Sequence, residues 1–323
     1  MTGSEPEASE SPGSVSGLCE QTVMGKAASV VPLQDGNLLS FHKSSQQNQA
    51  TAPKPAPVQQ NHGGNVHSEF SFLNQSASSS AFALELCSGT AGLTAALRAC
   101  GLEHSVGIDY IVKAGCRAPV CRLDLTAPHA QDMVRDWLRL PSLVYVHLGV
   151  PCGTSSRARE IRLSESDPPP LRSEEWPEGL PGLPAKEAAR VETANRTYQF
   201  AASTILLCNE LGKDWTLEQP HRSLFWKTTY WRSVEQHTDP VYVKFDHCMY
   251  KGHRPKRTMV AGSFAGLKGL ETFCDGQHAH LPWGRTPHGF ATAEEVQYPL
   301  ELRRAWAAIV AEHVKETLSL IHI

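Results

Sequence analysis

The sequence has little that would place it in a membrane or in an oxidising compartment. No stretch of its 323 residues approaches the roughly 18 consecutive apolar residues that a membrane-spanning helix needs. The N-terminus has no basic segment followed by an apolar one, so it does not resemble a secretory signal. The nine cysteines are odd in number and widely spaced, which favours free thiols in a reducing environment. We therefore expect an intracellular protein, nuclear or cytoplasmic, that binds no membrane.

The sequence also lacks an excess of positive charge. The formal net charge is −3, and the first 80 residues hold three lysines against six acidic residues. The remaining 243 residues carry 27 basic and 27 acidic side chains and are neutral. A globally basic nucleic-acid-binding protein would look different, so any anionic partner must be bound by local basic patches. The oligomeric state is left open.

Residues 1–80 have few aromatic residues and are rich in Ser, Gln, Pro, Gly and Asn, as in TAPKPAPVQQNHGG. Such a segment cannot bury enough apolar surface to offset the entropy lost on ordering. We predict a disordered low-complexity tail over 1–80, followed by one catalytic domain over 81–323.

From Phe82 onward, short apolar runs alternate with segments of helical spacing. The expected strands are 82–87, 105–110, 121–125, 143–150, 215–219, 241–248 and 258–262. The expected helices are 94–100, 130–140, 186–211 and 299–318. This alternation predicts an α/β fold, a doubly wound Rossmann-like and mostly parallel sheet, with an antiparallel late strand because 241–248 and 258–262 lie close together. Residues 163–187 form a Pro-rich insertion, either a lid or a packed surface loop.

The segment ELCSGTAGL, residues 85–93, lies between an expected strand and helix, where such sheets bind nucleotides. Its candidate ligand-binding residues are Ser88, Gly89 and Gly92, because glycines allow close backbone approach and the helix N-terminus offers free N–H groups. Asp109 ends the next strand and is placed to bind a ribose, and Asp124 ends the third and is placed to bind an adenine amino group. The alternative is a tight turn that binds nothing, with Ser88 and Thr90 capping the helix.

The acid at position 85 distinguishes among nucleotide cofactors. A carboxylate that opens the loop repels a pyrophosphate but attracts a cationic amino-acid group or a sulfonium. Glu85 therefore favours S-adenosylmethionine over a nicotinamide dinucleotide.

The order of these motifs resembles that of class I S-adenosylmethionine-dependent methyltransferases, specifically DNA cytosine-5 methyltransferases, over residues 82–262. LGVPCGTSS (148–156) is similar to their Gly-x-Pro-Cys-x-x-x-Ser loop, which implies a nucleophile at Cys152 with Pro151 beside the cofactor. TLEQP (216–220) resembles their Glu-Asn strand end, which implies a base-contacting role for Glu218. YKGHRPKRTMV (250–260) resembles their arginine-containing segment and places Arg257, less securely Arg254, near the active site.

The sequence departs from this family at two places that bear on the substrate. Gln219 replaces the family's Asn, and the last motif lacks its Gln. Only about 35 residues, 264–298, stand where the family has a target-recognition domain. The resemblance implies a nucleic-acid partner and favours DNA over RNA. Because of these departures, three alternatives stay open: a single-stranded or RNA substrate, another methyl acceptor, and an inactive protein.

The chemistry that the resemblance implies needs an ionisable, accessible thiol and a nearby acid. A thiolate that adds to carbon 6 of a cytosine makes carbon 5 nucleophilic, and Glu218 would hold the protonated ring. The alternative for Cys152 is a small buried hydrophobic residue. Phosphates would be bound by one of two groups, Arg157, Arg159 and Arg162 or Arg254, Lys256 and Arg257, unless these side chains form ion pairs or face solvent.

The segment CDGQHAH places Cys274, His278 and His280 within seven residues. Together with Cys248 they supply the soft donors that structural zinc prefers. The alternative is a polar loop with unpaired histidines. PCGTSSRARE and CDGQHAHLPWG also resemble segments of poorly characterised eukaryotic and mobile-element-like proteins, a resemblance that implies no chemistry of its own. The short recognition region keeps open an alternative function, a catalytically inactive, methyltransferase-like nucleic-acid-binding protein of mobile-element type.

Overall fold

The structure is a computed structural model that describes residues 80–321. The tail predicted over 1–80 lies outside the described residues, apart from Ser80. Within 80–321, no helix combines the length and the apolar composition that crossing a membrane would require.

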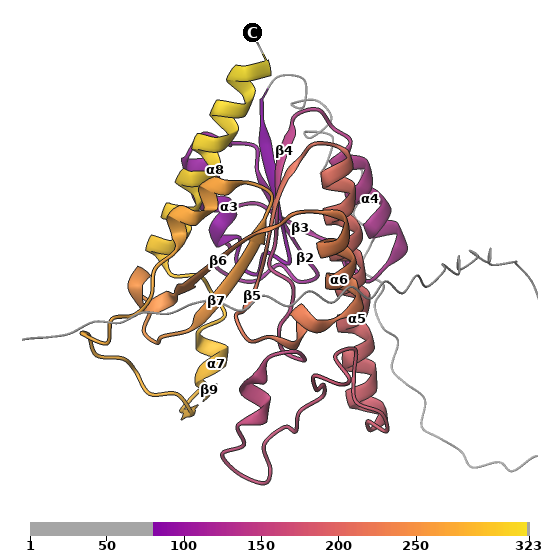
Figure 1. Ribbon diagram of the computed structural model, residues 1–323, viewed down its shortest axis with the longest axis vertical. Helices are drawn as coiled ribbons and strands as arrows, with labels where there is room; N and C mark the ends of the chain where they lie inside the picture. The colour runs from indigo at the N-terminus through magenta and orange to yellow at the C-terminus, as the bar shows by residue number, and fades with distance from the viewer. Residues whose placement is uncertain (1–79, 322–323) are drawn as a thin grey trace, which may run out of the picture. The chain divides into compact units, whose positions relative to one another are not determined.

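A seven-stranded sheet in the order β3-β2-β1-β4-β5-β7-β6 forms the centre of the described part (Figure 1). Its strands are β1 (Phe82–Leu86), β2 (Val106–Asp109), β3 (Val120–Arg122), β4 (Leu143–Leu148), β5 (Asp214–Pro220), β6 (Val241–Asp246) and β7 (Arg257–Gly262). β1 to β5 pair in parallel, and β7 runs antiparallel to both β5 and β6. The predicted Rossmann-like sheet with an antiparallel late strand is therefore confirmed.

Helices cover both faces of this sheet (Figure 1). One face carries α3 (Gly92–Ala99) and α8 (Leu300–Ile321), where Leu93 and Leu97 share a core with Trp306. The other carries α4 (Pro128–Leu138), α5 (Ala185–Glu210) and α6 (Thr229–His237), where Tyr198 and Trp231 belong to a second core. Because β1 and β4 are neighbours whose connections leave in opposite directions, the strand order reverses between them, and such a point is where doubly wound sheets bind ligands.

The structure differs from the sequence expectations mainly in short elements. Helix α6 was not expected, although its first turn has a Thr228 cap whose hydroxyl accepts from Trp231 N–H. β3 ends at Arg122, so Asp124 lies two residues beyond the strand rather than at its end. The loop 264–298 contains the small hairpin of β8 (Arg285–Thr286) and β9 (Gly289–Phe290), followed by α7 (Ala291–Glu294).

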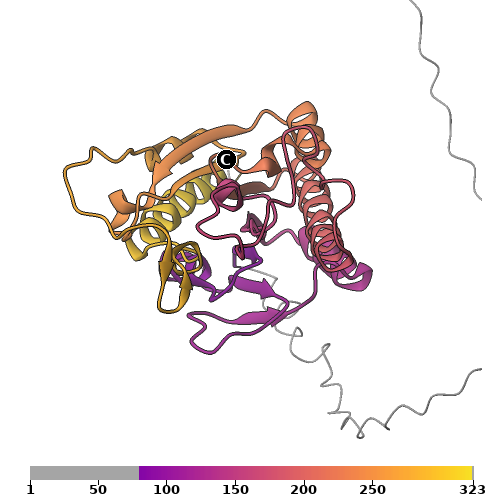
Figure 2. The same cartoon turned by 90° about the horizontal axis from the view of Figure 1, so that it is seen from below.

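The insertion before α5 is a packed surface loop rather than a free lid. Arg172 is 2% exposed and donates to Thr154 Oγ1 at 3.0 Å and to Asn195 Oδ1 at 2.8 Å. It also lies over the Tyr198 ring. Seen from below in Figure 2, this loop and the β8–β9 hairpin both lie at the end of the sheet where the parallel strands finish.

Candidate active site

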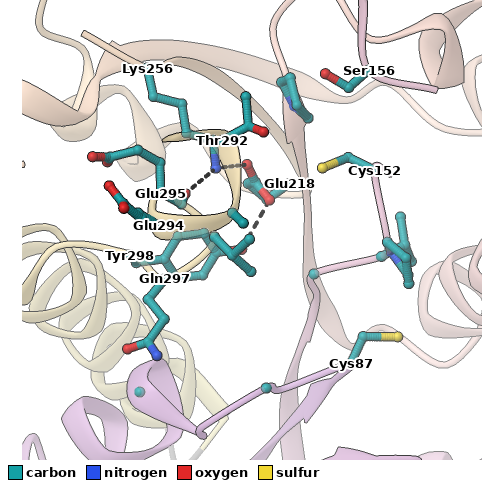
Figure 3. Close-up of a pocket in the computed structure, with 18 of the residues that line it drawn as sticks. Cys87, Cys152, Ser156, Glu218, Lys256, Thr292, Glu294, Glu295, Gln297 and Tyr298 are labelled. Carbon is teal, nitrogen blue, oxygen red and sulfur yellow. Dashed lines mark hydrogen bonds and ion pairs between the residues drawn. The ribbon is translucent and has the colours of Figure 1, made fainter. Parts of the chain in front are cut away.

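A cavity of about 760 Å³ opens at the carboxyl ends of β1, β4 and β5 (Figure 3). Its volume falls within the roughly 300–1,000 Å³ of small-molecule sites. The β1–α3 loop lines one side, and Cys152, Glu218 and Lys256 line the other. Segment 292–298 and Arg303 close it from the direction of α8. The cavity therefore lies at the point where the strand order reverses.

The β1–α3 loop has an unusual backbone. Cys87, Gly89 and Ala91 have φ angles of 59°, 59° and 54°, in the left-handed region that costs a non-glycine residue about 1 kcal/mol or more. Asp109 stabilises this conformation, because its carboxylate accepts from Gly89 N–H at 2.8 Å and from Ile111 N–H at 3.3 Å. Alternating left-handed residues turn backbone N–H groups toward one side, as ligand-binding loops do.

Glu85 replaces the missing cap of helix α3. Ala91 at the N-cap position has no side chain that could accept a hydrogen bond, and Glu85 Oε2 accepts instead from Thr94 N–H at 2.7 Å and from the Thr94 hydroxyl. The carboxylate is 4% exposed, and this burial raises its pKa to about 7, although the Thr94 hydrogen bonds act in the opposite direction. Glu85 is thus poised to gain from a cationic ligand.

Most of the predicted cofactor-binding residues line the cavity. Glu85, Ser88, Gly89, Gly92 and Pro151 do so. Gly92 lies against Arg303, where an added Cβ would come within 2.6 Å of Nη1. Asp109 lies behind the loop and holds it, as described above. Asp124 does not line the cavity, and its exposed carboxylate accepts from Thr126 N–H and Oγ1.

Cys152 stands four residues after β4 with its thiol directed into the cavity, on the side of Glu218 (Figure 3). Two side chains hold the backbone of the Cys152 loop. Tyr198 O–H donates to Pro151 O at 2.7 Å, and the Gln219 amide donates to Val150 O. The side chain is half-buried, and burial raises the pKa of the thiol, which Lys256 opposes and Glu218 reinforces. Cys152 is therefore accessible, but its ionisation depends on nearby charge.

Gln219, a departure from the family pattern, has a definite structural use. Its side-chain Oε1 accepts from Ser223 Oγ at 2.9 Å, and Ser223 in turn bonds to Ser155 Oγ at 2.9 Å. Ser155 and Val150 flank Cys152 in sequence, so Gln219 connects the end of β5 to the Cys152 loop.

Glu218 ends a series of hydrogen-bonded polar side chains that begins inside the sheet. Tyr298 O–H donates to Glu218 Oε2 at 3.2 Å, and His147 Nε2 lies 3.0 Å from the same hydroxyl. Because the tyrosine proton goes to Glu218, His147 Nε2 must donate, which leaves Nδ1 to accept from Thr216 Oγ1 at 2.9 Å. Burial lowers the pKa of His147 to about 3, so the ring is neutral.

The second oxygen of Glu218 faces a cation. Lys256 Nζ lies 3.8 Å from Oε1 and donates to Glu295 O at 3.2 Å (Figure 3). Glu218 Oε1 is buried and has no hydrogen-bond partner among residues 80–321. The carboxylate therefore keeps one oxygen whose hydrogen-bonding capacity is unused, next to a positive charge and across from Cys152.

The predicted phosphate-binding side chains are largely engaged within the protein. Arg254 is 3% exposed and pairs with Glu294 and Glu295, each at 3.0 Å, so it cannot present its guanidinium to a nucleic acid. Lys256 belongs to the Glu218 site instead. Arg257 lines the cavity and holds Asp246 through two bonds of 3.0 and 2.8 Å.

The arginine-rich loop forms internal contacts too. Arg157 pairs with Glu160 at 3.3 Å and with Glu174. Arg159 donates to Gly153 O at 2.7 Å and Pro169 O at 2.8 Å, and Arg162 donates to Glu165 O. Of the alternatives that the sequence left open, these contacts favour a set of ion pairs and loop-stabilising bonds over a preformed phosphate clamp.

The four predicted metal ligands come together. Cys248, Cys274, His278 and His280 place their donor atoms within 4.8 Å of one another. They do not line the cavity.

Sequence reasoning missed Tyr298 and His147, which connect to Glu218. His147 had a signal, since it is a histidine inside the apolar run LVYVHL and a buried imidazole needs partners. Tyr298 had none, because it stands 80 residues after Glu218 in a segment without a motif.

No protein-family model matches this chain, and no curated protein matches it. Among solved structures it is similar to a crystal structure of a mutant of DNMT2 from Spodoptera frugiperda, at 14% sequence identity and a TM-score of 0.34. The match covers 63% of this chain and 56% of that one, so the chain spans little more than half the length of that structure. At this distance the similarity carries no argument about function.

Proposed function

We propose that this chain is an S-adenosylmethionine-dependent methyltransferase that acts on a nucleic-acid base, carbon 5 of cytosine in DNA. The observation that carries the proposal is the convergence, in one cavity, of the strained β1–α3 loop, the Cys152 thiol and the Glu218 carboxylate. In this proposal residues 81–323 form the catalytic domain.

Cys152 would act as the nucleophile, and Glu218 would keep the ring nitrogen protonated. The Cys152 thiolate forms a bond to carbon 6, and the electron pair of the ring's double bond moves to carbon 5. Glu218 holds the proton on the ring nitrogen, using the oxygen that lacks a hydrogen-bond partner within the described chain. Carbon 5 would take the methyl group from the methyl donor, which leaves as a neutral thioether. Carbon 5 would then lose its proton to water, and the bond between Cys152 sulfur and carbon 6 would break to return the thiolate. Lys256 favours the thiolate, because its charge lowers the pKa of Cys152.

The residues of the loop fit S-adenosylmethionine as the methyl donor. It supplies an electrophilic methyl group on a cationic sulfonium. Glu85 offers a buried carboxylate that would gain from that cation, and the β1–α3 loop offers backbone N–H groups. Directly after Asp109, the apolar side chains of Tyr110, Ile111 and Val112 are 63%, 44% and 50% exposed, which supports contact with a flat, apolar ligand surface there.

A base in duplex DNA would have to leave the stack to reach Cys152. Arg254 is not carried into this proposal, because it is buried in ion pairs. Arg257 remains a cavity-lining cation, with a side chain that is 49% exposed. Arg157 and Arg159 would reach phosphates only by exchanging their present partners.

Covalent trapping tests the proposal. An oligonucleotide with 5-fluorocytosine cannot lose a proton from carbon 5, so the adduct with the nucleophile persists. We expect a stable adduct with the wild type when S-adenosylmethionine is present, no adduct with Cys152→Ala, and an unchanged adduct with Cys100→Ser, an exposed cysteine outside the cavity. A Cys152→Ala protein that traps as well as the wild type would contradict the mechanism.

A second candidate, a methyltransferase-like nucleic-acid-binding protein without thiol catalysis, is favoured by one observation. Burial is the largest influence on the Cys152 thiol and raises its pKa, so the resting nucleophile is protonated. Calorimetric titration separates the candidates. A protein that binds nucleic acid but not S-adenosylmethionine belongs to the second, whereas cofactor binding without a thiol adduct indicates another methyl acceptor.

A further inference from the structure

We propose that Cys248, Cys274, His278 and His280 bind one structural zinc ion. The four side chains come from two segments, with Cys248 in the 3₁₀ turn η3 (His247–Tyr250) and the others in the loop that follows η4 (Ala265–Leu270). This site lies outside the cavity, and the inference stands whether or not the chain transfers methyl groups.

The donor atoms already have the spacing of a four-coordinate site. Tetrahedral zinc with bonds of about 2.3 Å to sulfur and 2.0–2.1 Å to nitrogen requires ligand atoms roughly 3.3–3.8 Å apart. Cys274 Sγ lies 3.5 Å from His280 Nε2 and 3.9 Å from His278 Nε2, and the two Nε2 atoms are 3.0 Å apart. All four donors fall within 4.8 Å of one another.

The surroundings orient the donors inward. His278 points Nε2 at the cluster while its Nδ1 lies 3.6 Å from Asp275 Oδ1, an arrangement in which a carboxylate fixes the ring of a metal-binding histidine. Gly276 N–H donates to Cys274 Sγ at 3.4 Å, and Cys274 N–H donates to Asp246 Oδ2 at 2.9 Å. Two thiols and two imidazoles are the donor set that selects zinc over the harder magnesium or calcium.

The ion would have a structural role and no catalytic one. Four protein ligands close the coordination shell and leave no open position for a substrate. Immediately beyond His280, Leu281 N–H donates to His253 O at 2.9 Å, and Arg254 Nε donates to Pro282 O at 2.9 Å. The zinc site therefore anchors the segment that leads to Trp283, a cavity-lining residue, against the loop that carries Lys256.

Metal analysis of the full chain, purified under reducing conditions after growth in zinc-containing medium, tests this inference. We expect about one zinc per chain in the wild type, and a loss of most of it in Cys274→Ser and in His280→Ala. Cys100→Ser and His288→Ala serve as matched controls, because each removes an exposed side chain of the same type elsewhere, and both should retain the zinc.

A second measurement covers the case in which ligand variants fold poorly. Cobalt added to the chelator-treated wild type should give the absorption of tetrahedral thiolate coordination, and a chelator should lower the melting temperature of the wild type and of both controls. A wild type free of zinc, a Cys274→Ser protein that retains it, or a Cys248–Cys274 disulfide in the reduced, purified protein would each overturn the assignment.

Discussion

The two sides of the cavity are built by different means. The loop side, residues 85–93 with Asp109, is held by backbone conformation and by hydrogen bonds to nearby parts of the chain, such as Gly89 N–H to Asp109 and Arg117 N–H to Thr90 O. The wall side, Cys152, Glu218, Lys256 and Tyr298, is held by side chains from distant parts of the chain, such as Tyr298 and Glu218, 80 residues apart.

This difference predicts that the two sides fail separately. Damage to the loop side should weaken cofactor binding and leave Cys152 reactive. The backbone bond from Gly149 N–H to Leu86 O joins the two sides, but the Glu85 and Asp109 side chains that hold the loop bond to Thr94, Gly89 and Ile111 rather than to the Cys152 loop. Substitutions on the wall side should abolish methyl transfer and leave the affinity for the cofactor unchanged. The following variants test that separation.

The largest effect should come from Glu218→Gln. The amide cannot exchange a proton with the ring nitrogen, so we expect methyl transfer to fall by about 10²–10⁴-fold. The dissociation constant for S-adenosylmethionine, measured by calorimetry, should stay near the wild-type value, and Glu210→Gln on the exposed end of α5 should change neither quantity. Equal losses of transfer and of cofactor affinity would show that the two sides are one unit.

A smaller effect is expected from Lys256→Met. Burial raises the pKa of Cys152 and Lys256 lowers it, so removing the cation raises it further. Because the thiolate is the reactive form, the rate rises with pH, and the profile of the variant should move to higher pH, with a loss of roughly tenfold at neutral pH.

Iodoacetamide labelling of Cys152 across a pH series, followed by mass spectrometry, measures this shift without any substrate. Lys113→Met, which removes a cavity-lining cation from the loop side, is the matched control. The comparison fails if Lys113→Met shifts the labelling profile as much as Lys256→Met does.

Glu85→Gln should separate stability from binding on the loop side. The carboxyl pKa is about 7 in the folded protein and near 4.5 when unfolded, so the folded state binds the extra proton between these values and loses stability as the pH rises through them. Glutamine can still accept from Thr94 and has no charge to bury. The variant should therefore be more stable by roughly 1–3 kcal/mol at pH 7–8, with no gain near pH 4.5.

Denaturant unfolding at the two pH values measures this gain, with Glu103→Gln on the exposed surface as the control. The same variant should bind S-adenosylmethionine less tightly, because the buried carboxylate that faces the cation is gone. Unchanged stability at pH 8 would mean that Glu85 is not buried in its charged form.

Features with a local sequence pattern could be predicted, whereas features that depend on contacts between distant residues could not. The sheet and its larger helices were predictable because each has its own periodicity: the apolar run LVYVHL became β4, and the spacing over 186–211 became α5 (Ala185–Glu210). The β1–α3 loop was predictable because its glycines and its acid lie within nine residues. Cys152 and Glu218 could be predicted to lie at one edge of the sheet, because Cys152 follows β4 by four residues and Glu218 lies two residues before the end of β5.

The remainder depends on contacts that no local pattern records. Arg254 and Lys256 look alike in the sequence RPKR, yet one is buried against Glu294 and Glu295 and the other faces Glu218. Their separation follows from the path of the 264–298 loop, which has no strong periodicity. The end of β3 was predicted too late for a related reason: the segment CRLDL is apolar enough to suggest a longer strand, but pairing with β2 ends at Arg122.

The smallest effect, and the finest test of the wall side, is expected from Tyr298→Phe. The change removes one hydroxyl, which donates to Glu218 Oε2 and accepts from His147, and leaves both of those groups unpaired in a buried place. That should cost about 1–3 kcal/mol of stability. It should also lower kcat several-fold with little change in KM, since the hydroxyl orients Glu218 without touching the substrate.

Tyr145→Phe is the matched control. Tyr145 is fully buried, whereas Tyr298 is half-buried; Tyr145 bonds to Thr216 and Trp306 in the same hydrogen-bonded network, but it does not reach Glu218. It should lose comparable stability and keep its kcat. If both variants lower kcat equally, the tyrosine acts only by supporting the core, and the polar chain behind Glu218 does not position the carboxylate.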